Sequence, residues 1–195
     1  LPIQRTDFVV LYWGNFHKHH GLDTIIEAAA ILQKHGDIKF LLAGNGIEYN
    51  RVSKLVQEKK LTNVCLLGYL TNDVLSYLIK NADVCLGIFS RHELALCSLT
   101  NKVLEAMALK KAVITERSPA TLAMLRDQID VLLVPPEDSY ALTDAILHLK
   151  QDSSFRSRLE QEAYKTFLRL FSEDAIGRDL INILEETAVE EVQCG

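Results

Sequence analysis

The sequence predicts an α/β protein built on a doubly wound parallel sheet of about six strands. Short apolar runs of strand length alternate along the chain with segments whose apolar residues recur at helical spacing. The runs are continuously apolar, as expected of strands that helices cover on both faces of a parallel sheet. The chain has 195 residues, of which 48% are hydrophobic and 24% charged, and this size and composition fit one globular domain.

The first half of the chain supplies three strands and three helices. Residues 8–13 form an apolar run rich in residues that favour strands. Residues 22–35 follow as a helix, because their apolar side chains share one face and Gly36 stands just past the end. The next elements are a strand at 39–43 that glycine ends, a helix at 48–59, a strand at 64–67 that Gly68 closes, and a helix at 72–81.

The second half continues the alternation and then ends in helices. Residues 84–89 form a strand, and a polar loop leads from it to Thr100. Because parallel sheets of this kind bind ligands beyond the carboxyl ends of their strands, functional residues are expected directly after each strand. The remaining elements are a helix at 101–109, a strand at 112–115, a short helix at 119–126, a strand at 131–134 that two prolines stop, and helices at 139–150, 153–171 and 172–186.

Charge and cysteine usage argue against several classes of protein. The net charge of −5, from 21 basic and 26 acidic residues, argues against nucleic-acid binding, which normally needs a basic face. No apolar run approaches the ~20 residues of a membrane-spanning helix. The four cysteines lack CxxC spacing, which argues against a zinc site and for reduced thiols in a cytoplasmic protein. The chain begins with Leu1 and has no apolar leader, so we expect a piece of a longer protein.

A loop that begins and ends with glycine follows the first predicted strand, from Gly14 to Gly21. Glycine would let the backbone approach an anion, and the helix that begins after the loop offers free N–H groups and the positive end of its dipole. The alternative is a solvated polar turn. His17, His19 and His20 resemble a metal cluster, but one turn rarely directs three neighbouring imidazoles at one ion, so we expect no metal.

Two further stretches carry candidate site residues. Gly44 and Gly46 form a Gly-x-Gly turn after the second strand, without the third glycine of a dinucleotide-binding fingerprint. The predicted helix at 101–109 carries Lys102 and Glu105 in its first turns. Either Glu105 complements the helix dipole, or it reaches a ligand hydroxyl while Lys102 meets a phosphate, and the residues alone leave both readings open.

Taken in order along the chain, five stretches resemble one known family. They follow the pattern of the carboxyl-terminal lobe of the group 1 glycosyltransferases, retaining enzymes of family 4 with the GT-B fold. The most specific stretch is 101–115, which reads NKVLEAMALKKAVIT. The others are residues 10–30, the run FLLAGNG at 40–46, residues 63–70 and residues 82–87.

The resemblance implies a Rossmann-like domain over residues 1–195 that binds a nucleotide sugar, with residues 187–195 as a tail. The full enzyme would move a sugar from a UDP- or GDP-type donor to a hydroxyl of a glycan or lipid-linked acceptor, and would need no metal or other cofactor. The acceptor would bind an amino-terminal lobe absent from this chain. We therefore expect no catalytic residue in this lobe and no sugar transfer by the chain alone. The full-length enzyme is expected in the cytoplasm, free or attached to the membrane surface.

The resemblance also assigns residues of this sequence to parts of the ligand. Gly14 and the loop after it would face the diphosphate, and the backbone around Tyr69 would meet the base. Glu105 matches the second glutamate of the family's E-x7-E motif, which binds the ribose. The expected contacts with the nucleotide sugar are Gly14, Asn15, His20, Gly44, Gly46, Gly68, Tyr69, Leu70, Lys102 and Glu105.

The sequence departs from the family pattern at three positions. The first glutamate of E-x7-E falls at Cys97, and the usual arginine and lysine of the phosphate loop fall at Asn15 and His20. The positive charge that balances a leaving diphosphate is therefore reduced, although a protonated His20 with Lys18 and Lys102 would partly restore it. With His20 in that role, nucleotide binding would weaken as the pH rises through the imidazole range.

Two alternatives stay open. One is another GT-B enzyme, such as a sugar-nucleotide epimerase, against which the remnant of E-x7-E argues and which a product assay would identify. The other is a nucleotide-binding or regulatory α/β module without catalysis, which the departures at Cys97, Asn15 and His20 favour. A nucleotide titration distinguishes this second alternative, because such a module need not prefer any nucleoside diphosphate.

Overall fold

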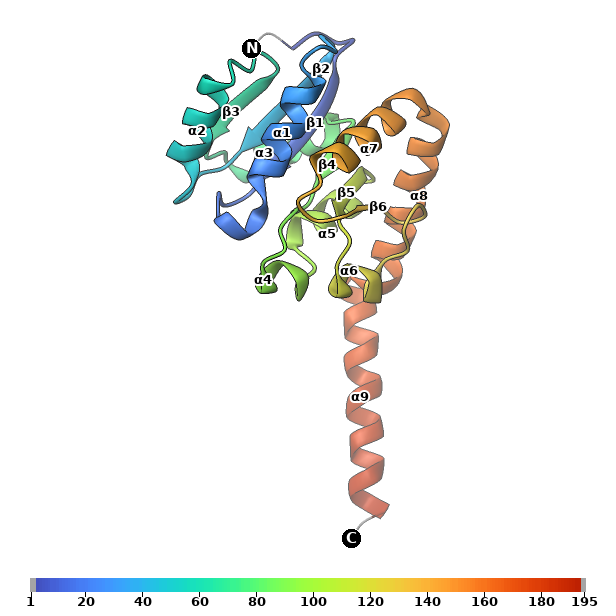
Figure 1. Ribbon diagram of the computed structural model, residues 1–195. Coiled ribbons are helices and arrows are strands. Elements are labelled where there is room, and N and C mark those ends of the chain that lie inside the picture. The colour runs from blue at the N-terminus through green and yellow to red at the C-terminus, as the bar shows by residue number, and fades with distance from the viewer. Residues whose placement is uncertain (1–2, 194–195) are drawn as a thin grey trace.

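The computed structural model describes residues 3–193, with side chains described to residue 187, and its centre is a parallel six-stranded sheet (Figure 1). The strand order β3-β2-β1-β4-β5-β6 places the first strand in the middle. This arrangement confirms the predicted doubly wound α/β fold. The strands are β1 (Phe8–Trp13), β2 (Ile38–Ala43), β3 (Val64–Gly68), β4 (Val84–Leu86), β5 (Ala112–Glu116) and β6 (Leu132–Val134).

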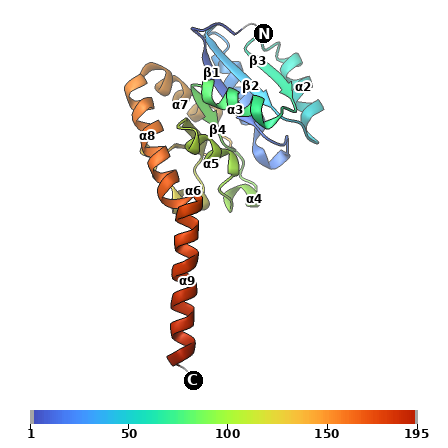
Figure 2. The ribbon, with the colours of Figure 1, turned by 180° about the vertical axis from the view of Figure 1, so that it is seen from behind.

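Helices cover both faces of the sheet. α1, α2 and α7 lie on one face, and α3 and α5 lie on the opposite face, which Figure 2 shows from behind. α8 contacts both α7 and α5. The helices are η1 (Lys18–His20), α1 (Leu22–Leu32), α2 (Tyr49–Glu58), α3 (Asn72–Asn81), α4 (Glu93–Leu96), α5 (Asn101–Ala108), α6 (Pro119–Met124), α7 (Ser139–Gln151), α8 (Ser153–Leu170) and α9 (Glu173–Gln193).

Alternate residues of the strands point into two apolar cores. Val10 and Tyr12 of β1 lie in the core beneath α1 and α7, whereas Leu11 and Trp13 lie in the core beneath α3 and α5. None of these four side chains is more than 4% exposed. Burial on both faces of the sheet is the physical reason why the strands read as continuous apolar runs.

The chain between β4 and α5 differs from the predicted strand and loop. β4 ends at Leu86 and not at residue 89, because Phe89 turns toward the loop after β1, where its N–H donates to the His20 carbonyl at 3.1 Å. The predicted polar loop to Thr100 contains the short helix α4. His92 caps this helix by accepting the Leu94 N–H at Nδ1, 3.3 Å away.

The last helix also differs from the prediction. α9 continues to Gln193, past residue 186, and extends away from the rest of the molecule at the end where α4 and α6 lie (Figures 1 and 2). Ala175 is buried, but Ile176, Leu180, Ile183 and Leu184 are each more than half exposed. Because these side chains are more than half exposed and belong to neither core, the two cores do not depend on this length of α9.

Two expectations from composition can be compared with the structure. Across the part of the chain that the structure describes, no helix combines the length and the apolar character needed to cross a membrane. Cys85 is buried, Cys65 is half-buried and Cys97 is exposed, while Cys194 lies outside the described residues.

The turns after β1 and β2 touch each other through their backbones. The Gly14 N–H donates to the Ala43 carbonyl at 3.0 Å, and the Gly44 N–H donates to the Gly68 carbonyl at 2.7 Å. Gly44 has a φ of +136°, and a Cβ there would overlap the Gly14 carbonyl oxygen. Glycine is therefore required at this contact, which extends the backbone ladder past the ends of the strands.

We expect Gly44→Ala to lower the free energy of unfolding by about 2 kcal/mol or more, because alanine is strained at positive φ and would collide with Gly14. Gly36→Ala is the matched control, since a Cβ at Gly36 meets no atom within 4 Å. It should change stability by less than about 1 kcal/mol. Urea unfolding followed by circular dichroism measures both variants, and equal stabilities would contradict the close contact.

Candidate functional site

Two adjoining cavities lie at the carboxyl ends of β1, β2 and β3 and at the start of α5. Their volumes are about 480 Å³ and about 170 Å³. Trp13, Gly14, Asn15 and Leu75 line both, so the two cavities form one region, here called the strand-end site. The larger cavity is completed by His20, Leu99, Thr100, Asn101, Lys102 and Glu105, and the smaller by Ala43, Gly44, Asn45, Tyr69, Leu70 and Asn72.

Eight of the ten residues that the sequence assigned to the ligand line the strand-end site. Gly46 does not: it packs against the loop after β1, where a Cβ would come within 2.7 Å of the Phe16 nitrogen. Gly68 does not either: it has a φ of +66° and shapes the turn that ends β3. The eight lining residues are Gly14, Asn15, His20, Gly44, Tyr69, Leu70, Lys102 and Glu105.

The side chain of Lys102 extends from the first turn of α5 toward Gly14. It is 7% exposed, and its Nζ lies 5.0 Å from the centre of the Tyr12 ring, within cation–π range. A Cβ added at Gly14 would lie 3.3 Å from the Lys102 Cε and 3.5 Å from Nζ, so the absence of a side chain there lets the end of the lysine lie close to the backbone. Among the residues that the structure describes, the ammonium has no hydrogen-bond acceptor.

Burial lowers the pKa of Lys102 to about 8, while the charges of Glu116 and Glu105 oppose this shift. Glu116, at the end of β5, is 1% exposed. Burial raises the pKa of the Glu116 carboxyl to about 7, although the Thr115 hydroxyl donates to its Oε2 at 2.6 Å. The other oxygen, Oε1, is buried without a hydrogen-bond partner among the described residues. Lys102 and Glu116 thus shift each other's pKa beside the larger cavity.

His20 does not carry the positive charge that the sequence analysis expected of it. Its Nδ1 and the Tyr12 hydroxyl are hydrogen-bonded at 2.8 Å. Burial, and next the charge of Lys102, lower the pKa of His20 to about 4. The imidazole is therefore neutral at neutral pH in the free protein, which argues against His20 as the source of the expected weakening of nucleotide binding through the imidazole range. The buried cation at this position is Lys102, on α5.

Four imidazole rings gather beside the larger cavity. The ring centres of His17, His19 and His20 lie 4.7 to 5.8 Å apart, and the His92 ring lies 5.8 Å from that of His19. Burial, and next the charges of His17 and His92, lower the pKa of His19. Among the side chains that the structure describes, no group of three or more His, Cys, Asp or Glu residues could hold a metal ion.

Trp13 is a site residue that the sequence analysis missed. Its indole Nε1 donates to Glu105 Oε2 at 2.8 Å, which joins the end of β1 to α5. The available signal was its position as the last strand residue before the Gly14 loop, at the ligand edge of the sheet. The other lining residues that the sequence analysis did not single out are Ala43, Asn45, Asn72, Leu75, Leu99, Thr100 and Asn101.

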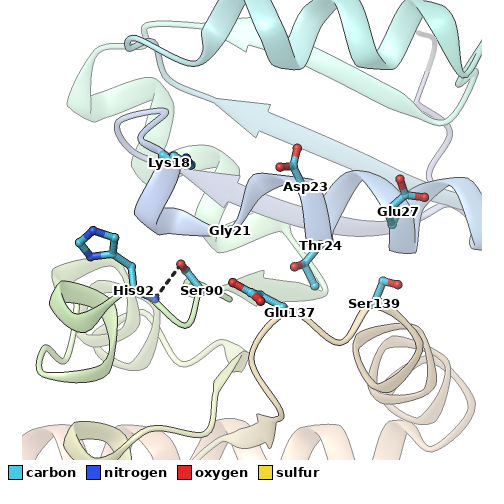
Figure 3. Close-up of a pocket in the computed structure, with 9 residues that line it drawn as sticks. All are labelled: Lys18, Gly21, Asp23, Thr24, Glu27, Ser90, His92, Glu137 and Ser139. Carbon is cyan, nitrogen blue, oxygen red and sulfur yellow. Dashed lines mark hydrogen bonds between the residues drawn. The ribbon is translucent and has the colours of Figure 1, made fainter.

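A third cleft, of about 470 Å³, lies between α1 and the loops that follow β4 and β6 (Figure 3). Its carboxylates, Asp23, Glu27 and Glu137, each form an ion pair with a basic side chain. Lys18 and His92, on the same cleft, are exposed. The charges of this cleft are thus paired or solvated, whereas the Lys102 ammonium of the strand-end site is nearly buried and has no acceptor within the described part of the chain.

The strand order and the site beyond β1 define the class of protein. The fold is that of the carboxyl-terminal lobe of GT-B glycosyltransferases. Residues 1–166 match the model of the family described as glycosyl transferases group 1, so the chain belongs to that family. The family, the fold and the GT-B assignment made from the sequence are confirmed.

Individual relatives agree with this assignment. The α-D-kanosaminyltransferase of Streptomyces kanamyceticus is 26% identical over 180 residues, which cover 91% of this chain and 45% of the relative. The carboxyl-terminal domain of the group 1 protein LpcC from Francisella tularensis superposes with a TM-score of 0.73 at 22% identity, covering 85% of this chain and 87% of that one. HepE from Anabaena, solved in complex with UDP and glucose, superposes with a TM-score of 0.79 at 18% identity, covering 92% of this chain and 48% of that one. The chain spans about half the length of the curated relatives it matches.

We expect Glu116→Gln to lower the pKa of Lys102 below its value of about 8, because a nearby negative charge that favours the ammonium is removed. The Lys102 side-chain carbon resonances, followed by NMR through a pH titration, measure this shift. Glu162→Gln, on the surface of α8, is the control and should leave the titration of Lys102 unchanged. A Lys102 pKa that stays the same or rises in Glu116→Gln would contradict the interaction between the charges of Lys102 and Glu116.

Proposed function

We propose that this chain is the donor-binding lobe of a glycosyltransferase that moves a sugar from a nucleoside-diphosphate sugar to an acceptor hydroxyl, with retention. The observation that carries the proposal is the buried Lys102 ammonium, which faces Gly14 in the larger cavity without an acceptor among the described residues. A buried charge is costly unless it is paired, so this position favours an anionic ligand.

The start of α5 offers further donors for the same anion. Thr100, which precedes the helix, makes no side-chain capping hydrogen bond, and the first turn contains no acidic residue. The Thr100 hydroxyl is also buried without a partner among the described residues. The first N–H groups of α5 and the positive end of its dipole therefore add to the Lys102 ammonium. These groups suit a diphosphate, on which negative charge develops as the sugar departs.

The neighbouring residues suit the nucleoside. Glu105 lies one turn after Lys102 on α5 and lines the same cavity, so its carboxylate can accept hydrogen bonds from two adjacent ribose hydroxyls. Tyr69, which is 81% exposed, and Leu70 line the smaller cavity beside Gly44 and offer flat, apolar contact to a base. The UDP in the HepE complex supports a uracil nucleotide as the first ligand to test.

Two departures from the family pattern, beside the expected sugar and the expected diphosphate, favour a second candidate, a nucleotide-binding module without transfer activity. Cys97 is exposed at the carboxyl end of α4, where the family pattern has a carboxylate. His20 is neutral, where the family pattern has a lysine. Both candidates require nucleotide binding, and they differ only in the fate of the sugar. A product assay on the full-length protein separates transfer, epimerisation and binding alone.

Acceptor binding and any sugar transfer are properties that we assign to a longer protein, since the chain spans about half of its relatives. The donor-binding proposal can be tested on this chain by calorimetric titration with UDP, GDP and their sugar conjugates. We expect binding of at least one nucleoside diphosphate. The matching monophosphate should bind more weakly, because it lacks the second phosphate group. A chain that binds no nucleoside diphosphate at millimolar concentration would overturn the proposal.

The proposed site predicts a pH dependence that Lys102 controls. The protonated side chain attracts the diphosphate, so affinity should fall as the pH rises above about 8, the pKa of Lys102 in the free protein. A bound anion raises this pKa, so the fall should extend further into the alkaline range. The phosphates do not contribute, because their last ionisation, near about pH 6, is complete by then.

Calorimetry across this range measures the effect, with Lys102→Met as the comparison. The variant should bind nucleoside diphosphates about tenfold or more weakly at neutral pH, because a hydrogen bond to a charged group contributes roughly 1.5–3 kcal/mol. Its remaining affinity should change with pH much less than that of the unmodified chain above about pH 7.5, because the contribution of the Lys102 ammonium has been removed. The same pH slope in both proteins would remove Lys102 from the site.

A second prediction concerns Glu105. Glu105→Ala should weaken nucleoside-diphosphate binding by about tenfold or more, because hydrogen bonds between its carboxylate and the ribose are lost. Glu58→Ala, which removes an exposed carboxylate from the end of α2, is the control and should bind as the unmodified chain does. If Glu105→Ala lost only thermal stability, the role of its carboxylate would be structural, in the helix dipole and in the hydrogen bond from Trp13.

A further inference from the structure

The hydrogen bond between Trp13 and Glu105 joins a buried residue to an exposed one. Trp13 is 4% exposed and packs in the core beneath α3 and α5, where the surrounding side chains hold its ring. Glu105 lies on the solvent side of α5, and its carboxylate is the acceptor for the indole N–H. Both residues line the larger cavity. The contact therefore connects a donor that the core holds in place to the exposed Glu105 side chain, which has several rotatable bonds.

The geometry leaves most of the Glu105 carboxylate available to a ligand. An indole N–H is a single donor, and a carboxylate has about four acceptor positions on its two oxygens. The bond at Oε2 therefore occupies one position and leaves Oε1 open, since Glu105 Oε1 makes no hydrogen bond among the described residues. It also restricts the rotamers of an exposed glutamate, whose ordering would otherwise cost free energy when a ligand binds.

We propose that Trp13 is a positioning residue that holds the Glu105 carboxylate in the orientation that accepts the two ribose hydroxyls, and so sets the preference for ribonucleotides. This inference rests on the proposed donor site, because it requires a nucleotide beside Glu105. Trp13 need not touch the ribose for this role. It acts by fixing the acceptor before the nucleotide arrives, which is the general basis of preorganised binding.

The test uses Trp13→Phe, which keeps an aromatic ring in the core and removes only the N–H donor and part of the ring. Leu41→Val is the matched control, since Leu41 lies in the same core on β2 and also loses volume on substitution. Each protein is titrated with UDP and with 2′-deoxy-UDP, or with the GDP pair if calorimetry shows that base to be preferred. The quantity compared is the ratio of the two affinities, which a general loss of stability does not change.

We expect the unmodified chain and Leu41→Val to prefer the ribonucleotide by about tenfold. Trp13→Phe should reduce this preference to about threefold or less, and in the Glu105→Ala background it should have no further effect on the ratio. An unchanged ratio in Trp13→Phe would overturn the inference. Equal losses of affinity for both nucleotides would also overturn it, because they would indicate a structural role alone.

The chain has one tryptophan, so its indole N–H gives a single resonance in a ¹H–¹⁵N spectrum of the free protein. Glu105→Ala should shift this resonance, and an unmoved signal would show that the hydrogen bond does not form. The titrations distinguish a wrong positioning role for Trp13 from a wrong assignment of the donor site. If the chain binds both nucleotides equally well, the positioning role is wrong while donor binding stands. If it binds neither, the proposed function fails, and this inference with it.

Discussion

The backbone contact between the turns at Gly14 and Gly44 is the constraint on which the strand-end site depends. No side chain separates the ends of β1 and β2, because a Cβ at Gly44 would overlap the Gly14 carbonyl oxygen. The missing side chain at Gly14 in turn lets the end of the Lys102 side chain lie close to the backbone, since a Cβ there would come within 3.3 Å of the Lys102 Cε. The site is built from strand ends and a helix start, which position side chains more accurately than long loops do.

Burial then decides the charge of each group near that contact. It lowers the pKa of Lys102 and of His20 and raises that of Glu116, because the charged form of each is poorly solvated. Lys102 lowers the pKa of His20 further, while Glu116 and Glu105 help Lys102 keep its proton. Of these two basic groups, Lys102 is therefore charged at neutral pH and His20 is not. In the proposed site, the Lys102 ammonium on the first turn of α5 supplies the positive charge that His20 lacks.

The elements that could be predicted from the sequence are those that the residues within each element determine. The six strands could be found because burial on both faces makes a strand apolar at every position, and most helices because their apolar residues share one face. The end of β4 and the helix α4 could not be found, since the first depends on a hydrogen bond between Phe89 and His20 across the fold. The neutral state of His20 depends on burial, which no nearby residue reveals. Trp13 was hidden for a related reason: an indole in an apolar run gives no sign of an acceptor far along the chain on α5.

The three departures from the family pattern all lie in connections between a strand and a helix. Asn15 and His20 lie in the connection between β1 and α1, and Cys97 lies in the connection between β4 and α5. Trp13, Lys102 and Glu105 lie at a strand end and on α5, where the core limits their positions. Connections tolerate substitution more readily than packed elements, because fewer neighbours must adjust. Changes in the connections therefore alter charge and hydrogen bonding beside the diphosphate and sugar, while the proposed ribose and phosphate contacts on α5 are retained. On this argument, we expect this chain to differ from its relatives in how it treats the sugar more than in whether it binds the nucleotide.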